Sequence, residues 1–148
     1  MILYILRHGE AEHASIHPER PLTENGKLEI QKLADSIGRL PVRTIYHSGK
    51  ARAKETAEII AQGLPVQQRD HLNPNDELDS ILAEINAQNN NILIVSHMPF
   101  VSRLVSQLLF GNEQSHIIAF DTGTLVALEK EHGHWFIREV ISPKDVRA

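Results

Sequence analysis

Short apolar strands alternate along the chain with segments of helical periodicity, and this alternation limits the fold more than any other feature of the sequence. Three strands stand out as short runs of apolar residues, and a minor strand is predicted beside them: Ile2–Leu6, Thr44–His47, Ile92–Val95 and Val66–Arg69. The C-terminal third reads as three more strands, which we expect to pair in antiparallel fashion, with a hairpin turn at His132-Gly133: Ile117–Phe120, Thr124–Leu128 and Trp135–Ile141.

Helical spacing of apolar residues separates these strands, at residues 23–38, 53–63, 75–85 and 99–111. Thr23 is expected to cap the first helix, and Asn75 or Asp76 the third. This order predicts an α/β fold with a single open central sheet. The sheet is expected to be mostly parallel with antiparallel edge strands and to carry helices on both faces, in one domain that spans residues 1–148.

Polar side chains follow three of the strands at their carboxyl ends. Arg7-His8-Gly9 follows the first strand, His47-Ser48-Gly49-Lys50 ends the second, and Ser96-His97 follows the strand at Ile92–Val95. Ligands of open parallel sheets bind beyond the carboxyl ends of the strands. We therefore expect these three segments to meet in one site.

Composition excludes several classes of protein. The 148 residues carry a formal net charge of −4, which gives no general attraction to nucleic acid or to anionic membranes. No apolar run approaches the roughly 20 residues of a transmembrane helix, and the first residues lack the basic start and cleavage site of a signal peptide, so we expect a cytoplasmic protein. Because the chain has no cysteine, covalent catalysis here would need another nucleophile.

His8 is the candidate for that nucleophile. A histidine at the end of a strand can offer one ring nitrogen for attack while a carbonyl group fixes the other, and Gly9 permits close approach of the backbone to a bound group. Attack requires the neutral imidazole, and neighbouring arginines would disfavour its protonated form. The tripeptide alone also fits a loop histidine beside an incidental arginine, so the hypothesis depends on its partners.

Arg52 and His97 are the predicted partners. Arg52 lies at the start of a helix, where its planar guanidinium group could donate two parallel hydrogen bonds to a phosphoryl group, although an ion pair with Glu55 or Glu58 is the alternative. His97 follows a fully apolar strand and could donate to a phosphoryl oxygen. The helix that begins near Pro99 would add its positive end.

Four motifs occur in order between Met1 and about Gly111: Arg7-His8-Gly9-Glu10-Ala11, Arg20-Pro21-Leu22-Thr23, His47-Ser48-Gly49-Lys50 with Arg52-Ala53, and Ser96-His97-Met98-Pro99. In this order and spacing the chain resembles the histidine phosphatase superfamily, also called phosphoglycerate mutase-like. Within that superfamily it is most similar to the short bacterial phosphohistidine phosphatases of the SixA type.

The resemblance implies a role for five residues. His8 would accept the phosphoryl group, Arg7 and Arg52 would clamp the phosphate, His97 would complete the pocket, and Arg20 would be a further substrate contact. The reaction would proceed by in-line attack of His8 on phosphorus, followed by attack of water on phospho-His8. This scheme requires no metal and no cofactor.

Two arguments favour a phosphohistidine on another protein as the substrate. The segment between Gly63 and Ile92 is too short for the lid that covers the site in larger superfamily members, and an open site suits a phosphorylated side chain. Imidazole, whose conjugate acid has a pKa of about 6.5, also leaves with little help, whereas an alkoxide needs a positioned acid. Asp76, Glu77 and Asp79 are open to that acid role, and none is assigned to it.

Two other functions are alternatives for the same residues. A broad-specificity phosphomonoesterase acting on small sugar or nucleotide phosphates would use the same fold, and a non-catalytic adaptor would bind phosphoproteins through the arginines. The sequence does not identify the phosphorylated partner, which could be a phosphorelay or a phosphotransferase component. The pairs His13/His17 and His132/His134 lack a further ligand at recognisable spacing, so we expect turn histidines and no metal site.

Overall fold

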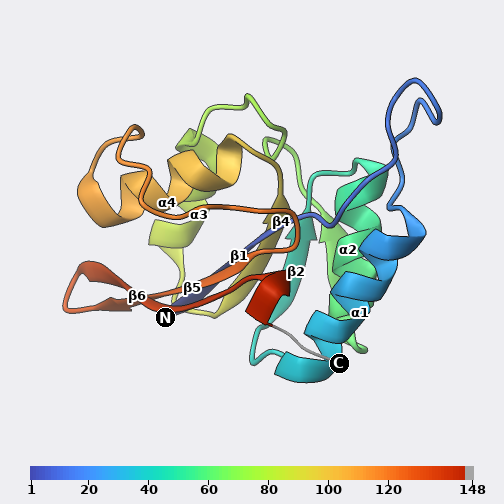
Figure 1. Cartoon of the computed structure of the whole chain (residues 1–148). Coiled ribbons are helices and arrows are strands. Elements are labelled where there is room, and N and C mark those ends of the chain that lie inside the picture. The colour runs from blue at the N-terminus through green and yellow to red at the C-terminus, as the bar shows by residue number, and fades with distance from the viewer. Residues whose placement is uncertain (146–148) are drawn as a thin grey trace.

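The computed structural model describes residues 1–145, and within them six strands form one sheet in the order β3-β2-β4-β1-β5-β6 (Figure 1). The elements follow one another as β1 (Ile2–Arg7), α1 (Glu24–Ile37), β2 (Thr44–His47), α2 (Ala51–Ala61), β3 (Val66–Gln68), α3 (Asp79–Ala87), β4 (Ile92–Ser96), α4 (Phe100–Phe110), β5 (Leu125–Glu131) and β6 (His134–Ile141). A short 3-10 helix, η1 (Pro143–Asp145), follows β6.

Parallel pairing dominates the sheet. β3, β2, β4 and β1 run in one direction, β5 pairs antiparallel with β1, and β6 pairs antiparallel with β5. The prediction of a mostly parallel sheet with antiparallel edge strands is therefore confirmed. The register places Arg7 opposite Ser96, so the polar ends of β1 and β4 lie side by side.

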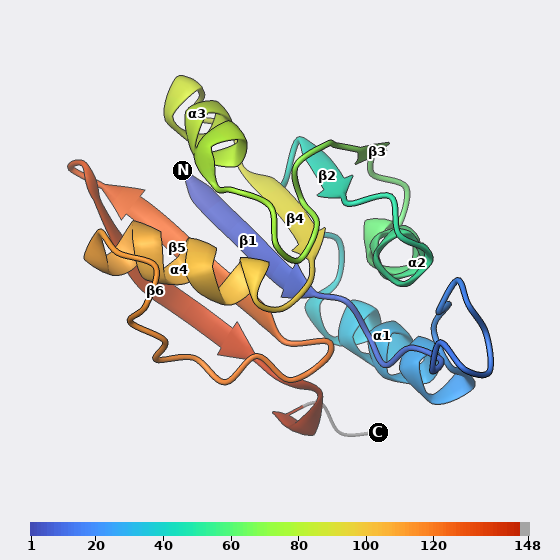
Figure 2. The ribbon, with the colours of Figure 1, turned by 90° about the horizontal axis from the view of Figure 1, so that it is seen from above.

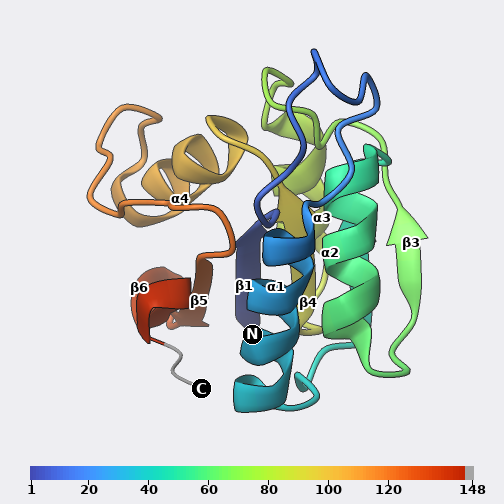
Figure 3. The same cartoon turned by 45° about the vertical axis from the view of Figure 1, so that its right-hand side comes forward.

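Helices cover both faces of the sheet because its central strands are apolar on both sides. All five residues of β4 are buried, with Ile92 and Ile94 facing α3 and α4 and with Leu93 and Val95 facing α1 and α2. Figures 2 and 3 show these two helix pairs on opposite sides of the sheet. Burial on both faces accounts for the continuous apolar run of this strand, which is typical of a central parallel strand.

Most predicted elements match the structure, with two exceptions. Thr23 caps α1 as predicted, its hydroxyl accepting a hydrogen bond from the Gly26 amide at 2.9 Å. The predicted cap of α3 is wrong, because that helix begins at Asp79 and its N-cap, Leu78, provides no side-chain hydrogen bond. The strand predicted at Ile117–Phe120 is also wrong: this segment is a loop that runs to the end of β1.

The C-terminal hairpin follows the prediction. His132 and Gly133 join β5 to β6, and both have positive φ angles, of 52° and 80°. Two consecutive positive φ angles suit the tight turns that connect antiparallel strands. Among residues 1–145, no helix is both long enough and apolar enough to cross a lipid bilayer.

Candidate active site

The turn after β1 is held by main-chain hydrogen bonds from both neighbouring strands. The His8 amide donates to the Ser96 carbonyl at the end of β4, at 3.0 Å. On the other side, the Gly123 amide, just before β5, donates to the carbonyl groups of both Arg7 and His8, at 3.0 Å each. The backbone that carries the candidate nucleophile is therefore fixed in position by the sheet itself.

Packing against α1 explains the glycine in this turn. A Cβ atom at Gly9 would lie 2.8 Å from the Ile30 side chain and 3.3 Å from that of Leu22. The sequence interpretation gave Gly9 a role in approach to a bound group. In the structure the close approach is made to the helix, which brings α1 against the end of β1.

Among residues 1–145, the imidazole of His8 has a hydrogen-bond partner for one ring nitrogen and none for the other. Its Nδ1 lies 2.7 Å from the Gly9 carbonyl oxygen. A carbonyl group can only accept, so Nδ1 must carry the hydrogen, and the lone pair of the neutral ring is on Nε2. The sequence prediction that a carbonyl would fix one ring nitrogen agrees with this geometry, and Nε2 is the atom left for attack.

Burial keeps the His8 ring neutral. The side chain is 6% exposed, and burial is the largest cause that lowers the pKa of His8, to about 4. The hydrogen bond to the Gly9 carbonyl opposes this change, while the positive charges of Arg52, Arg7 and Arg20 lower the pKa further. The sequence argument named only the arginines, and the larger contribution of burial was not foreseen.

Arg7 and Arg52 bring unpaired guanidinium nitrogens to the same place. Arg7 ends β1, and its Nη1 donates to the Phe120 carbonyl at 2.6 Å, which fixes the side chain. Arg52 is the second residue of α2. Within residues 1–145, the Nε atom of each arginine is buried and has no hydrogen-bond partner. Each arginine thus has one buried N–H donor, on a positively charged group, that is available to an anion.

His97 completes the group beside His8. Their ring centroids are 5.0 Å apart. The His97 side chain is 1% exposed, and its Nε2 lies 2.7 Å from the Ser48 hydroxyl oxygen, whereas its buried Nδ1 has no partner among the described residues. Burial is the main cause that lowers the pKa of His97, to about 2, followed by the charges of His8 and Arg52. The ring is therefore neutral at pH 7.

Ser48 can set which nitrogen of that neutral ring carries the hydrogen. The Lys50 amide donates to the Ser48 hydroxyl oxygen at 3.3 Å, which leaves the hydroxyl hydrogen free to point at His97 Nε2. With Nε2 accepting, Nδ1 must be the N–H donor. The unpaired nitrogen of His97 is then a donor, like the unpaired nitrogens of Arg7 and Arg52. Sequence reasoning gave Ser48 no role.

Thr56 is a second residue that sequence reasoning missed. Its hydroxyl donates to the Arg52 carbonyl one turn earlier in α2, at 2.7 Å, and accepts a hydrogen bond from the Gly9 amide at 3.0 Å. This fully buried side chain joins the start of α2 to the turn after β1. Its signal in the sequence was the threonine four residues after Arg52, a spacing that places both residues on one face of a helix.

Arg20 lies at the edge of the same group. Its φ angle is 50°, and its Nε donates to the Glu12 carbonyl at 3.1 Å, which fixes it within the loop between β1 and α1. The positive charge of Arg20 contributes to the lowered pKa of both His8 and His97. The structure therefore brings Arg7, His8 and His97 together at the carboxyl ends of β1 and β4, places Arg52 in the first turn of α2, and leaves Arg20 in the loop between β1 and α1.

The candidate acids have other partners or are exposed. The carboxylate of Asp76 accepts a hydrogen bond from the Asn73 amide at 2.8 Å, within its own loop. Glu77 and Asp79 are exposed, and Asp79 lies in the first turn of α3, where an acidic residue is favourable. None of these three carboxylates is among the groups that shift the pKa of His8 or His97.

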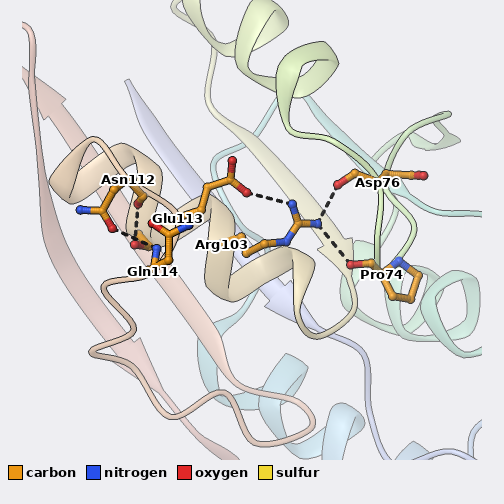
Figure 4. A network of polar contacts seen from close by, with 7 residues as sticks. Pro74, Asp76, Arg103, Asn112, Glu113 and Gln114 are labelled. Carbon is orange, nitrogen blue, oxygen red and sulfur yellow. Dashed lines mark hydrogen bonds and ion pairs between the residues drawn. The ribbon is translucent and has the colours of Figure 1, made fainter.

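Arg103 fixes the loop that carries these acids. Figure 4 shows its guanidinium group between α4, the segment after α4 and the loop before α3. It pairs with Glu113 at 3.0 Å and donates to the carbonyl groups of Pro74 and Asp76, at 3.3 and 2.7 Å. The Asp76 carbonyl is thereby held toward α4.

The other histidines form no cluster of ligands. Residues 1–145 contain no group of three His, Cys, Asp or Glu side chains arranged to hold a metal ion. Nδ1 of His13 lies 3.1 Å from the Ser15 hydroxyl, and Nε2 of His132 lies 3.7 Å from the Glu131 carboxylate.

In chemical terms, the site combines an uncharged imidazole with unpaired N–H donors around it. The Nε2 lone pair of a neutral His8 is chemically able to act as a nucleophile, and the donors on Arg7, Arg52 and His97 suit the oxygens of a tetrahedral oxyanion. Two of these side chains are held by hydrogen bonds, Arg7 by the Phe120 carbonyl and His97 by Ser48. Such an arrangement can stabilise charge that develops on a transferring group.

The sequence matches a known family and a known protein. The model of the histidine phosphatase superfamily (branch 1) matches residues 3–77 of the chain. Phosphohistidine phosphatase SixA of Escherichia coli (strain K12) is 29% identical over 122 residues, which cover 75% of this chain and 76% of that protein.

Solved structures extend the likeness to the whole chain. The structure of the protein histidine phosphatase SixA complexed with tungstate has a TM-score of 0.82 at 26% identity, over 99% of this chain and all of that one. The alpha-ribazole phosphatase from Shigella flexneri has a TM-score of 0.81 at 21% identity, over 97% of each chain. The second likeness is one of fold alone.

Proposed function

The chain belongs to the histidine phosphatase superfamily (branch 1), and from this premise we propose that it is a phosphohistidine phosphatase that acts on another protein. One observation carries the proposal: the Nε2 lone pair of a neutral His8 lies within a group of unpaired donors from Arg7, Arg52 and His97. The similarity to phosphohistidine phosphatase SixA supports the choice of substrate.

The first proposed step transfers the phosphoryl group to His8. The Nε2 lone pair attacks phosphorus in line with the substrate's P–N bond, a new P–N bond forms on His8, and the substrate imidazole departs with the electron pair of the broken bond. The departing nitrogen takes up a proton from solvent. Because Nδ1 of His8 donates to the Gly9 carbonyl, the positive charge that develops on the His8 ring is stabilised as it forms.

The second proposed step releases phosphate. A water molecule attacks phosphorus and gives up a proton to solvent, the P–N bond to His8 breaks, and the electron pair returns to Nε2, which restores the neutral ring. In both steps the donors on Arg7, Arg52 and His97 bind the equatorial oxygens, and Arg20 contacts the phosphoryl group from the edge of the site. No metal ion takes part in the proposed reaction.

The leaving group is the reason to prefer phosphohistidine over an alcohol phosphate. An alkoxide needs a positioned acid that contributes roughly 10²–10⁴ in rate, whereas imidazole leaves readily at neutral pH. The Asp76 carboxylate is bonded within its loop, and Glu77 and Asp79 are exposed. A phosphorelay or phosphotransferase component of the cytoplasm is the proposed partner.

Trapping of the phosphoenzyme tests the mechanism. Purified protein is mixed with a ³²P-labelled phosphohistidine protein, quenched in alkali within milliseconds to seconds, and analysed for acid-labile label. We expect label on the wild-type chain and none on His8→Ala, while the control His13→Ala, which removes an exposed loop histidine, should label like wild type. Equal labelling of wild type and His8→Ala would refute the covalent role of His8.

A substrate panel tests the specificity. The alpha-ribazole phosphatase with the same fold makes a small phosphate ester the natural competitor. We expect a higher kcat/KM on a phosphohistidine protein than on p-nitrophenyl phosphate or sugar phosphates. The reverse order would replace the proposal with a phosphomonoesterase, and tight binding of phosphoprotein without release of phosphate would replace it with an adaptor.

A further inference from the structure

The N-terminal turn of α2 carries positive charge where helices favour negative charge. Lys50 is the N-cap, Arg52 and Lys54 follow within the first turn, and that turn has no acidic residue. The partial positive charge at a helix N-terminus disfavours cations. By contrast, α1 begins with a threonine cap and with Glu24. The stability of α2 therefore does not explain its three cations.

Arg52 has a place in the pocket, whereas the two lysines do not. Lys50 and Lys54 are exposed, and among residues 1–145 neither ammonium group forms an ion pair. The neighbouring Glu55 forms no ion pair with either lysine within residues 1–145, and its carboxylate accepts a hydrogen bond from the Leu22 amide at 2.9 Å. We call Lys50 and Lys54 the lysine rim.

The lysine rim borders the site of phosphoryl transfer. Both lysines and Arg52 line a hollow of about 500 Å³ between α2 and the loop that precedes α1, where Glu19 contributes one carboxylate. Arg52 lines this hollow, and its charge also lowers the pKa of His8. The charge of Lys50 contributes to the lowered pKa of His97, so the rim lies within electrostatic range of the reacting groups.

We propose that the lysine rim docks an acidic face of the phosphohistidine-bearing protein, a proposal that rests on the function proposed above. The chain as a whole carries a formal net charge of −4 and would repel an acidic protein. The face beside His8 differs, because its unpaired lysines give it local positive charge. Attraction of an acidic partner to this face would orient its phosphorylated side chain toward His8. Complementary charge of this kind acts mainly on association rate and orientation.

Charge reversal at Lys54 separates docking from chemistry. Lys54→Glu is compared with Lys32→Glu, which makes the same charge change at an exposed position of α1 outside the rim. The substrates are a histidine phosphotransfer protein with carboxylates around its phosphohistidine, and free phosphohistidine. For Lys54→Glu we expect kcat/KM on the protein to fall about tenfold or more at low salt, mainly through KM, and to fall much less on free phosphohistidine.

Salt and stability sharpen the test. The deficit of Lys54→Glu should shrink as salt rises from about 0.02 to about 0.5 M, because the range of surface charges shortens to a few ångströms. Thermal unfolding should show no loss of stability, since an acidic residue at this end of α2 is favoured and offsets the new repulsion from Glu58. Lys50→Gln, which removes one charge without reversing it, should give a smaller deficit in the same direction.

The outcomes distinguish this inference from the proposed function. If the wild-type chain hydrolyses phosphate esters and no phosphohistidine protein, the proposed function fails. If it hydrolyses the phosphoprotein and Lys54→Glu equals Lys32→Glu at low salt, the lysine rim is not a docking site. An equal loss on free phosphohistidine and on the protein would also overturn the inference, because the charge would then act on the chemistry.

Discussion

Ser48 offers the most stringent test of the site, because its hydroxyl acts through His97 and touches no substrate in the proposed reaction. Ser48→Ala removes the group that donates to His97 Nε2 over 2.7 Å. Both side chains are buried, at 8% and 1% exposure, so no bulk water replaces the lost donor freely. In this variant the His97 imidazole stays in place, but no hydroxyl group favours the tautomer with hydrogen on Nδ1.

Two magnitudes follow from this loss. A buried acceptor left without its donor costs about 1–3 kcal/mol, and the free energy of unfolding should fall by that amount. Deleting a donor to the transition state outright costs roughly 10²–10³ in kcat. In Ser48→Ala the ring can still adopt the donating tautomer at some cost, so we expect a smaller loss in kcat, of about 10- to 100-fold.

A matched control separates catalysis from stability. Ser102, on α4, is also buried and lies 2.7 Å from Nδ1 of His116, away from the pocket. Ser102→Ala removes the same kind of bond and should lower the free energy of unfolding without lowering kcat. Ser48→Thr, which retains the hydroxyl, should recover part of the activity.

The assay is steady-state hydrolysis of a phosphohistidine substrate, with urea unfolding of each variant. A kcat for Ser48→Ala within twofold of wild type would refute the assignment of the His97 tautomer. So would an equal loss of kcat in Ser102→Ala, because the effect would then follow stability alone.

Three further predictions concern the dependence of stability on pH, the contribution of Arg103 to stability, and the metal dependence of activity. In the folded protein the pKa values of His8 and His97 are lowered to about 4 and about 2, so below about pH 6.5 these two residues bind more protons in the unfolded chain than in the folded one. The free energy of unfolding therefore decreases as the pH is lowered. At pH 5 each ring should lower it by about 2 kcal/mol relative to pH 7. Urea unfolding at both pH values measures this, and a His8→Asn/His97→Asn variant that keeps the full dependence would contradict it. Arg103→Ala should cost about 2–3 kcal/mol in the same assay, because it leaves two carbonyl groups and one carboxylate without their partner; a loss below 0.5 kcal/mol would show that the loop holds without it. Activity should survive dialysis against EDTA, and a loss restored by a divalent cation would refute the metal-free scheme.

The parallel part of the fold could be predicted because each strand carries its own signal. β2 matches the predicted Thr44–His47 at both ends, and β4 extends the predicted apolar run by one residue, to Ser96. Apolar content wrongly predicted a strand at Ile117–Phe120, where Phe120 is buried while Ile117 is 59% exposed. Phe120 is buried by packing near the end of β1, where its carbonyl accepts from Arg7, and not by pairing in the sheet.

The site could be predicted in part, for a related physical reason. Residues at the ends of adjacent parallel strands come together wherever the sheet forms, so strand order predicted that His8 and His97 would lie close together, and the family resemblance supplied their expected roles. Ser48 was quoted within a motif but had no assigned role, since its use depends on a distance of 2.7 Å to a side chain 49 residues away. Contacts of that kind arise from tertiary packing, which local patterns do not encode.

Burial of His8 also changes what the arginines contribute to catalysis. Had guanidinium charge been the main cause of the neutral imidazole, the loss of Arg52 would have raised the His8 pKa toward 6.5 and protonated part of the nucleophile at neutral pH. Burial is the larger cause, so Arg52→Ala should leave the ring neutral at pH 7. The rate lost in this variant then measures the charge that Arg52 stabilises in the transition state, and the acidic limb of its pH profile should stay well below pH 6.5. A limb that moved to pH 6.5 together with the loss of rate would show that the arginine controls protonation instead.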